Sequence, residues 1–205
     1  MLGEPIVGPL VGSGIKLKIF PVVLTTWGEW LQEHPDTLAL SRNTGFYSPT
    51  QYEPEDDNQS IYYEYRANPE PIFPVWDRDD RLEAKDEVLG LSIDDKHRAY
   101  PIAQIQERRL INDLVNGVSV VVLGSSISSE ARAYRTQGTE FSLADDSDKA
   151  FPRTLLDRDG NEWSVADTSL VKLSDPTVTR PAIPANVSFW FGWYTFHPDT
   201  QVFVP

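Results

Sequence analysis

The stretch Pro21-Val-Val-Leu-Thr-Thr-Trp-Gly-Glu-Trp-Leu-Gln-Glu-His-Pro-Asp-Thr37 recurs near the end of the chain as Pro184-Ala-Asn-Val-Ser-Phe-Trp-Phe-Gly-Trp-Tyr-Thr-Phe-His-Pro-Asp-Thr200. The two stretches align without a gap, and the rare Trp, Trp and His residues are among the identical positions. Self-similarity at a fixed offset is typical of repeated structural units. The sequence therefore predicts that the chain holds two copies of the ending of one unit.

Each copy has the pattern of a short helix followed by a turn. Thr26 and Glu29 form a capping-box pattern, and Trp27, Trp30, Leu31 and His34 fall on one helical face. The prolines after the histidines end the helices, and short strands are expected at residues 38–40 and 201–203. Residues 22–40 and 185–203 should share one conformation. The four tryptophans of the copies, at positions 27, 30, 190 and 193, are predicted to be core residues.

The rest of the chain divides by composition. Residues 5–20 alternate weakly and suggest strands, whereas residues 42–86 are rich in Pro, Asn, Asp, Glu and Tyr without periodicity. From residue 87 a hairpin is expected at 88–93 and 97–100, followed by a short helix, a strand at 118–123, and hairpins at 131–134 with 140–143 and at 153–156 with 163–165. We predict a mainly β fold (β-rich α+β) with short helices at the two Trp-x-x-Trp…His-Pro-Asp-Thr endings. The predicted parts are 1–41, the tail of a first, truncated repeat unit; 42–86, an irregular linker; and 87–205, a second repeat unit.

Composition excludes several classes of function. The chain of 205 residues has a net charge of −13, which argues against binding the phosphate backbone of a nucleic acid. It contains no Cys, so thiol chemistry cannot occur within these residues. No run of 18 apolar residues is present, so membrane insertion is not expected. No cofactor is predicted, and the compartment stays open: cytoplasmic by default, with an exported parent protein as the alternative.

The His-Pro-Asp-Thr segments are the main candidates for a site. His34 with Asp36, and His197 with Asp199, offer an imidazole and a carboxylate that can bind a divalent metal or act as a base with its orienting group. The alternative is structural: the His closes the helix, while Asp and Thr bond to their own turn. We favour the structural role, because a duplicated turn is commoner than a duplicated catalytic site.

Two further polar segments are interpreted as structural. Asp157, Asp159 and Asn161 resemble the start of a calcium loop, but the Gly and Glu that an EF-hand needs at its sixth and twelfth positions are absent. A hairpin turn is favoured there. Residues 78–81, Arg-Asp-Asp-Arg, form either a self-paired turn or a substrate clamp, and the turn is favoured because such surface pairs are common.

An ordered set of motifs resembles the uncharacterised family called domain of unknown function 3179. The set comprises the repeated Trp-x-x-Trp-x-x-x-His-Pro-Asp-Thr ending, Gly8-Pro-Leu-Val-Gly12, Phe73-Pro-Val75, Arg78-Asp-Asp-Arg-Leu82, Val88-Leu-Gly-Leu91, Arg98-Ala-Tyr-Pro101 and Ile111-Asn-Asp113. The resemblance implies a protein of two related units, in which many members carry Cys-Pro-Leu-Cys or a selenocysteine variant in the first unit. In this chain the aligned stretch of the second unit, residues 120–126, has no thiol.

Three functions remain open at this point. The first is a β-rich module without its own catalytic centre, a fragment or supporting half of a larger two-unit protein. Its partner would be the rest of that protein, or a second copy bound through an exposed sheet edge. The second is part of a thiol or selenol oxidoreductase whose redox residues lie upstream of Met1. The third is a metal-dependent hydrolase that uses His34, Asp36, His197 and Asp199. Whether the chain is an enzyme is left undecided.

Overall fold

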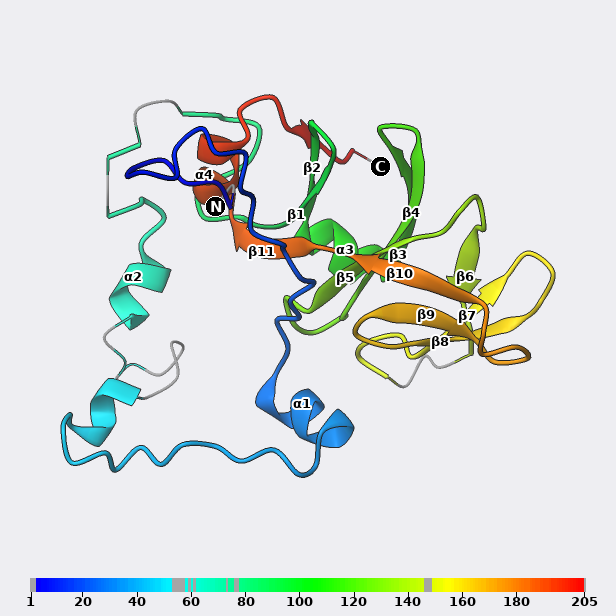
Figure 1. Ribbon diagram of the computed structural model, residues 1–205. Helices are drawn as coiled ribbons and strands as arrows, with labels where there is room; N and C mark the ends of the chain where they lie inside the picture. The colour runs from blue at the N-terminus through cyan, green and yellow to red at the C-terminus, as the bar shows by residue number, and fades with distance from the viewer. Residues whose placement is uncertain are drawn as a thin grey trace.

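The computed structural model describes residues 3–52, 58, 60, 62–72, 74–75, 78–145 and 149–204, apart from the side chain at position 50. It is mostly β, with 31% strand and 15% helix, so the predicted fold class is confirmed. The strands lie in two sheets between residues 87 and 202, and the N-terminal part of the chain is drawn out beside them (Figure 1). None of the helices in the described ranges has the length and apolar character needed to cross a bilayer.

The larger sheet, which we call the barrel, has eight strands and is nearly closed. Its order is β3 (Leu110–Val115), β4 (Val118–Gly124), β5 (Ala131–Arg135), β10 (Thr179–Ile183), β9 (Ser169–Lys172), β8 (Glu162–Val165), β7 (Thr154–Asp157) and β6 (Phe141–Leu143). The Asn112 side chain joins β3 to β6, the first and last strands of this order. Its amide NH2 group donates to the Phe141 carbonyl at 2.8 Å, and its amide oxygen accepts from the Phe141 N–H at 3.0 Å. The interior is packed with Trp163, Tyr134, Leu155 and other buried apolar side chains.

The smaller sheet has the order β11 (Ala185–Phe189), β1 (Glu87–Ile93), β2 (Lys96–Pro101) and β12 (Gln201–Val202). Only Pro184 separates β10 from β11, so the chain passes directly from one sheet into the other. A second core, including Leu89, Ile105 and Val122, joins the two sheets around helix α3 (Ile102–Arg108). Helix α4 (Trp190–Phe196) follows β11 and packs against β1.

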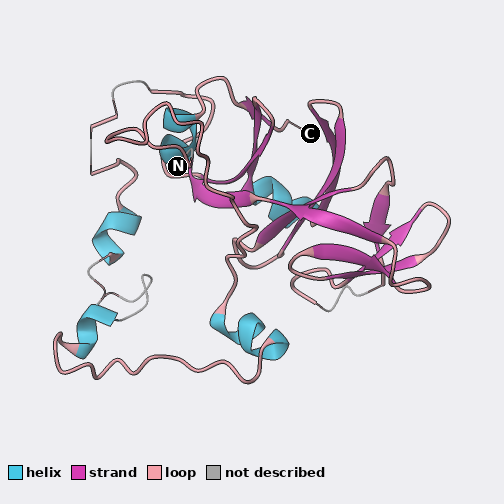
Figure 2. Cartoon of the chain, in the orientation of Figure 1, coloured by secondary structure: helices cyan, strands magenta, loops and turns pink. Residues whose placement is uncertain are grey.

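The N-terminal part contains helix α1 (Trp27–Glu33), the 3-10 helix η1 (Pro49–Tyr52) and helix α2 (Tyr63–Ala67). No strand forms in the described residues before position 87 (Figure 2), so the strands expected in 5–20 and at 38–40 are wrong. Their apolar side chains are exposed, among them Ile6, Val7, Leu38 and Leu40. A strand needs a neighbour to receive its backbone hydrogen bonds, and these segments lie beside none.

The expected hairpins were right where a local turn decides the pairing. β1 pairs with β2 across Asp94-Asp95, β3 with β4 across Asn116-Gly117, and β7 with β8 across the turn after Asp157. The predicted hairpin between 131–134 and 140–143 is wrong. Both strands form, but β5 pairs with β4 and β10, whereas β6 pairs with β7. The Gly-containing turn between them did not decide their partners, because both sides of β5 are taken by β4 and β10, and β6 pairs with β7 instead.

We predict that Asn112→Ala lowers the free energy of unfolding by about 1–2 kcal/mol, because two hydrogen bonds between the terminal strands of the barrel are lost. Urea unfolding of the full chain measures the change. Leu114→Ala on the same strand is the control and should stay within about 0.5 kcal/mol, since this side chain is exposed. Equal effects of the two substitutions would show that Asn112 does not hold the barrel closed.

Candidate functional site

The two repeated endings share the conformation of their helix and of the residues that bound it. α1 and α4 are both seven residues long and begin at equivalent tryptophans. Thr26 and Phe189, which precede them, are extended, with ψ of 152° and 148°. The residues that end them, His34 and His197, have φ/ψ of −129°/65° and −137°/65°. The prediction that the two segments share a helix that ends at His is confirmed. The strand after the turn forms only in the second copy.

The side chains of the repeated motif explain its shared conformation. The Trp30 indole donates to the Thr37 hydroxyl at 2.9 Å, and the Trp193 indole donates to Thr200 at the same distance. His34 lies on the Trp30 ring with centroids 4.1 Å apart, and the equivalent rings of the second copy are 4.2 Å apart. Each motif therefore closes on itself, with the turn fastened to the helix through the second tryptophan. Asp36 and Asp199 lie exposed in the two turns.

The surroundings of the second copy are apolar. Trp190 is fully buried and Trp193 is 7% exposed, in a cluster with Val88 and Ala99 of the β1–β2 hairpin. Gly90 lies directly beneath the second tryptophan, because a Cβ built at position 90 would overlap the Trp193 ring. For these two tryptophans the prediction of a core position is confirmed.

Residues 78–86 cover the other side of α4. The Trp190 indole donates to the Asp79 carbonyl at 2.9 Å, and Arg81 donates to the Thr200 carbonyl at 2.7 Å. The guanidinium of Arg81 also forms an ion pair with Asp79, which holds the pKa of that carboxyl below its usual range. Of the self-paired turn that we favoured, the Arg81–Asp79 pair is observed, whereas Arg78 pairs with Glu70 outside the turn.

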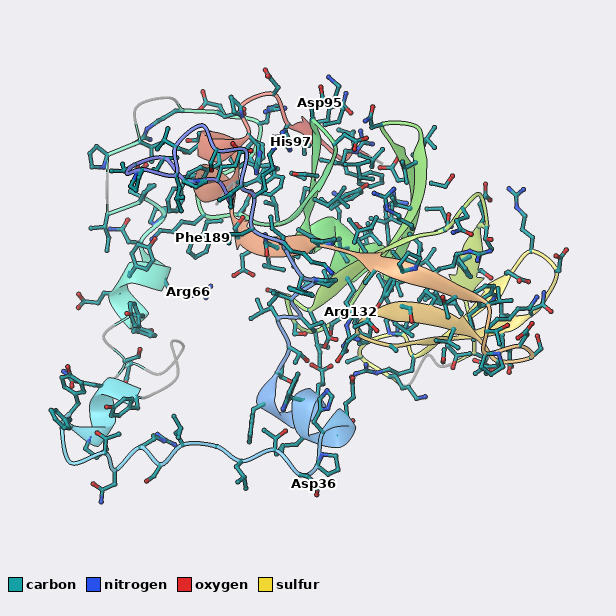
Figure 3. All side chains as sticks on the ribbon, in the orientation of Figure 1. Asp36, Arg66, Asp95, His97, Arg132 and Phe189 are labelled. Carbon is teal, nitrogen blue, oxygen red and sulfur yellow. The ribbon has the colours of Figure 1, made fainter. Side chains whose placement is uncertain are left out.

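The surroundings of the first copy are polar on one side and open on the other. Trp27 is 52% exposed and Trp30 is only partly buried, so the prediction of core positions is wrong for Trp27 and is not met in full by Trp30. The segment is attached to the barrel through Arg132 of β5 (Figure 3), whose side chain is only 4% exposed. Arg132 forms ion pairs with Glu130 at 2.6 Å and Asp167 at 2.8 Å, and lies 3.5 Å from Glu33 of α1.

The buried carboxylate of this network also binds the first copy directly. Thr25 donates to the Glu130 carboxylate at 2.7 Å. Burial raises the pKa of Glu130, and the Thr25 hydroxyl and the Arg132 guanidinium oppose that rise. Arg153 adds a further ion pair with Glu33. Such a network fixes the position of α1, although removal of its charges from water offsets much of the attraction.

One group of acidic and histidine side chains has the geometry for a metal ion. Ligand atoms of Glu33, His34 and Asp167 lie within 4.8 Å of one another, and no other such group of three occurs in the described part of the chain. Arg132 contacts both carboxylates of the group, and Arg153 contacts Glu33. These positive charges disfavour a cation, so the geometry fits an ion-pair network better than a metal centre.

The four candidate residues of the hydrolase hypothesis lie in two places. His34 is next to Asp167, with 3.5 Å between Nε2 and Oδ2, rather than next to Asp36. His197 lies instead against His97 of β2, with ring centroids 4.0 Å apart. α1 and α4 are well separated in Figure 1, so no single centre combines both histidines. A metal role for either one stays a prediction.

His97 was missed in the sequence. It stacks on His197, and its Nδ1 lies 2.7 Å from the Ser92 hydroxyl across the hairpin. Burial, followed by the positive charge of His97, lowers the pKa of His197 to about 4. The chain has only three histidines, and the position of His97 on a predicted strand was the signal that could have identified it. His97 contacts Trp193, His197 and Ser92, so this pair packs the end of α4 against β2.

A groove of about 810 Å³ runs along the outer side of α4. Its lining is mainly apolar, with Val75, Phe191 and Phe196 among its residues. Its charged residues are Arg78 and Asp79, which are paired with Glu70 and Arg81. The groove therefore offers apolar surface but no arrangement of nucleophile and base.

We predict that the two equivalent tryptophans differ strongly in their effect on stability. Trp190→Ala should lower the free energy of unfolding by about 3–5 kcal/mol, because a fully buried ring is removed. Trp27→Ala, the matched change in the first copy, should cost less than about 1 kcal/mol, because the ring is half exposed. Urea unfolding of the full chain measures both. Equal losses would contradict the difference in burial.

We also predict that part of the stability depends on the proton of His197. Because its folded pKa is lowered to about 4, the unfolded chain binds this proton more readily, and stability falls as the pH drops from about 6.5 towards 4. His197→Gln should flatten the change in unfolding free energy between about pH 7 and pH 5. A slope that survives His197→Gln would refute the assignment.

Comparisons with known proteins agree with the motifs. No curated protein and no solved structure shows significant similarity to the chain. A family model described as "Protein of unknown function (DUF3179)" matches residues 1–200. The match spans both repeated endings and the barrel between them. The chain therefore belongs to the DUF3179 family.

Proposed function

We propose that the chain is a β-rich module without its own catalytic centre, which packs against the rest of a larger two-unit protein. In this proposal residues 87–205 are a second repeat unit, residues 42–86 a linker, and residues 1–41 the tail of a first unit. The observation that carries the proposal is the contrast between α1 and α4. Their conformations are equal, but the apolar face of α4 is covered and that of α1 is open.

The open surface extends over the whole N-terminal tail. Within the described part of the tail, residues 3–41, thirteen large apolar side chains are exposed: Ile6, Val7, Leu10, Val11, Ile15, Leu17, Ile19, Phe20, Val22, Leu24, Trp27, Leu38 and Leu40. Apolar residues gathered in one segment at this density are typical of an interaction surface. By contrast, all strands of the described chain and the three apolar cores lie in residues 75–203. The tail thus supplies contact surface, and the second unit supplies the stable scaffold.

The other hypotheses find less support in the described residues. The sequence holds no Cys, so a thiol or selenol oxidoreductase would need redox residues outside residues 1–205. Reading the coding sequence upstream of Met1 in frame, for Cys codons or a recoded stop, tests that role directly. Metal-dependent hydrolysis by all four candidate residues would need His34 and His197 in one centre, and they lie apart.

We predict that the purified full chain associates with itself or binds an apolar dye through its tail. Replacing Leu24, Leu38 and Leu40 by Ser should weaken association without lowering the melting temperature, because these side chains are exposed. Sedimentation velocity and thermal unfolding measure the two effects. A chain that is monomeric and dye-free at high concentration, or a clear loss of melting temperature in the triple variant, would show that the tail is not a contact surface.

A further inference from the structure

The open surface of the first copy consists of residues Val22, Leu24, Trp27, Trp30 and Leu40, which we call the α1 face. Val22 and Leu24 precede the helix, the two tryptophans lie on it, and Leu40 follows its turn. Leu40 is 99% exposed, Val22 is 67% exposed, and the indole of Trp30 is partly buried. The face therefore runs from the segment before α1 to the segment after it.

The second copy shows what covers this face. The equivalent residues are Ala185, Val187, Trp190, Trp193 and Phe203, and all of them are buried or partly buried. The β1–β2 hairpin covers them with both of its sides: Trp190 and Trp193 pack on the side of Val88 and Ala99, and the other three pack on the side of Leu89 and Tyr100. Phe203, for example, stacks on Tyr100 of β2 with centroids 5.4 Å apart.

The hairpin reaches both ends of the motif. β1 pairs with β11 in antiparallel fashion, with Leu89 opposite Val187. β2 pairs with β12 in parallel fashion, with Ala99 opposite Val202. In the first copy the corresponding segments, 22–26 and 38–39, form no strand. In the described residues the first copy therefore has no β-hairpin that pairs with the segments on both sides of its helix, as β1–β2 does in the second copy.

We infer that the α1 face binds a β-hairpin of the same design as β1–β2, supplied by the first repeat unit of the same polypeptide. This inference rests on the proposed function. In the second unit the hairpin precedes its helix in the same chain, and the gapless correspondence of the two motifs gives the first helix the same order of elements. The first strand of that hairpin pairs with residues 22–26, and the second pairs with residues 38–39.

The α1 face also determines the chemistry of the hairpin. Trp30 has the same bond to its threonine and the same stacking on its histidine as Trp193, so its ring needs a glycine at the position of Gly90. Where Gln201 accepts a hydrogen bond from Arg98 at 2.8 Å, the first copy has Leu38. The second strand should therefore carry an apolar residue in place of Arg98.

The experiment joins such a hairpin to the full chain. A second copy of residues 86–101, with Arg98→Leu in that added copy, is fused to Met1 through about ten Gly and Ser residues, which span about 18 Å on average. Amide hydrogen exchange is then measured in the fused and unfused chains. We expect exchange at residues 22–26 and 38–39 to slow by about tenfold or more in the fusion, because their N–H groups gain strand partners. The matched control carries Gly90→Val in the added copy only, and its extra side chain should remove the protection.

Each outcome bears on one claim. Protection of 22–26 and 38–39 in the fusion, lost with Gly90→Val in the added copy, supports the hairpin. Exchange that stays fast in the fusion, or protection that is equal in the control, overturns it and leaves the proposed function standing. Self-association of the unfused chain can also protect these residues, but the joined hairpin should displace it, so protection that still grows with concentration in the fused chain assigns the face to a second copy and overturns the inference. Strong protection in the unfused monomer would mean that the N–H groups of these residues already have partners within the chain, and the proposed function itself would then fail.

Discussion

The Trp193 ring occupies the space that any side chain at position 90 would need, and this contact fixes helix α4 across the β1–β2 hairpin. The strand before the helix then pairs with β1, and the strand after its turn pairs with β2. Because β11 continues from β10 of the barrel, the same contact determines how the small sheet meets the large one. The shared core around Ile105 and Val122 depends on that junction.

The first copy keeps its helix although the described segments on either side of it form no strand. A helix of seven residues is too short to be stable alone in water. In α1 it is held by the Thr26 cap, by the bond from Trp30 to Thr37, and by ion pairs with Arg132 and Arg153. In α4 the helix is held by the packing of two buried tryptophans, Trp190 and Trp193. Local sequence thus determines the conformation of each copy, whereas the available partner determines its burial.

This division explains what could be predicted from sequence. Turns at Asp94, Asn116 and Asp157 identified three hairpins, because the pairing there is local. At Asp157, burial disfavours the charged carboxylate, but hydrogen bonds from the Trp163 indole and Asn161 outweigh it and lower the pKa to about 2. That turn is therefore held by its own side chains, as the sequence indicated.

The errors come from contacts between distant parts of the chain. β9 to β11 have four or five residues each and no clear alternation, so their pairing across the barrel left no local signal. Trp27 and Trp190 lie in the same local pattern, but Trp190 packs against Val88 and Ala99 of the β1–β2 hairpin, whereas Trp27 stays half exposed. The network around His34 joins α1 to Arg132 and Asp167, which lie far from it in the sequence, and no spacing rule predicts it.

Helices α1 and α4 have the same conformation, but their first tryptophans differ in burial. The solvent isotope shift of fluorotryptophan tests this difference most directly. The full chain is labelled with 5-fluorotryptophan, its ¹⁹F signals are assigned with single Trp→Phe variants, and spectra in H₂O and D₂O are compared. We expect a large shift for Trp27, which is half exposed, and almost none for Trp190, which is fully buried. Equal shifts for these two residues would contradict the account.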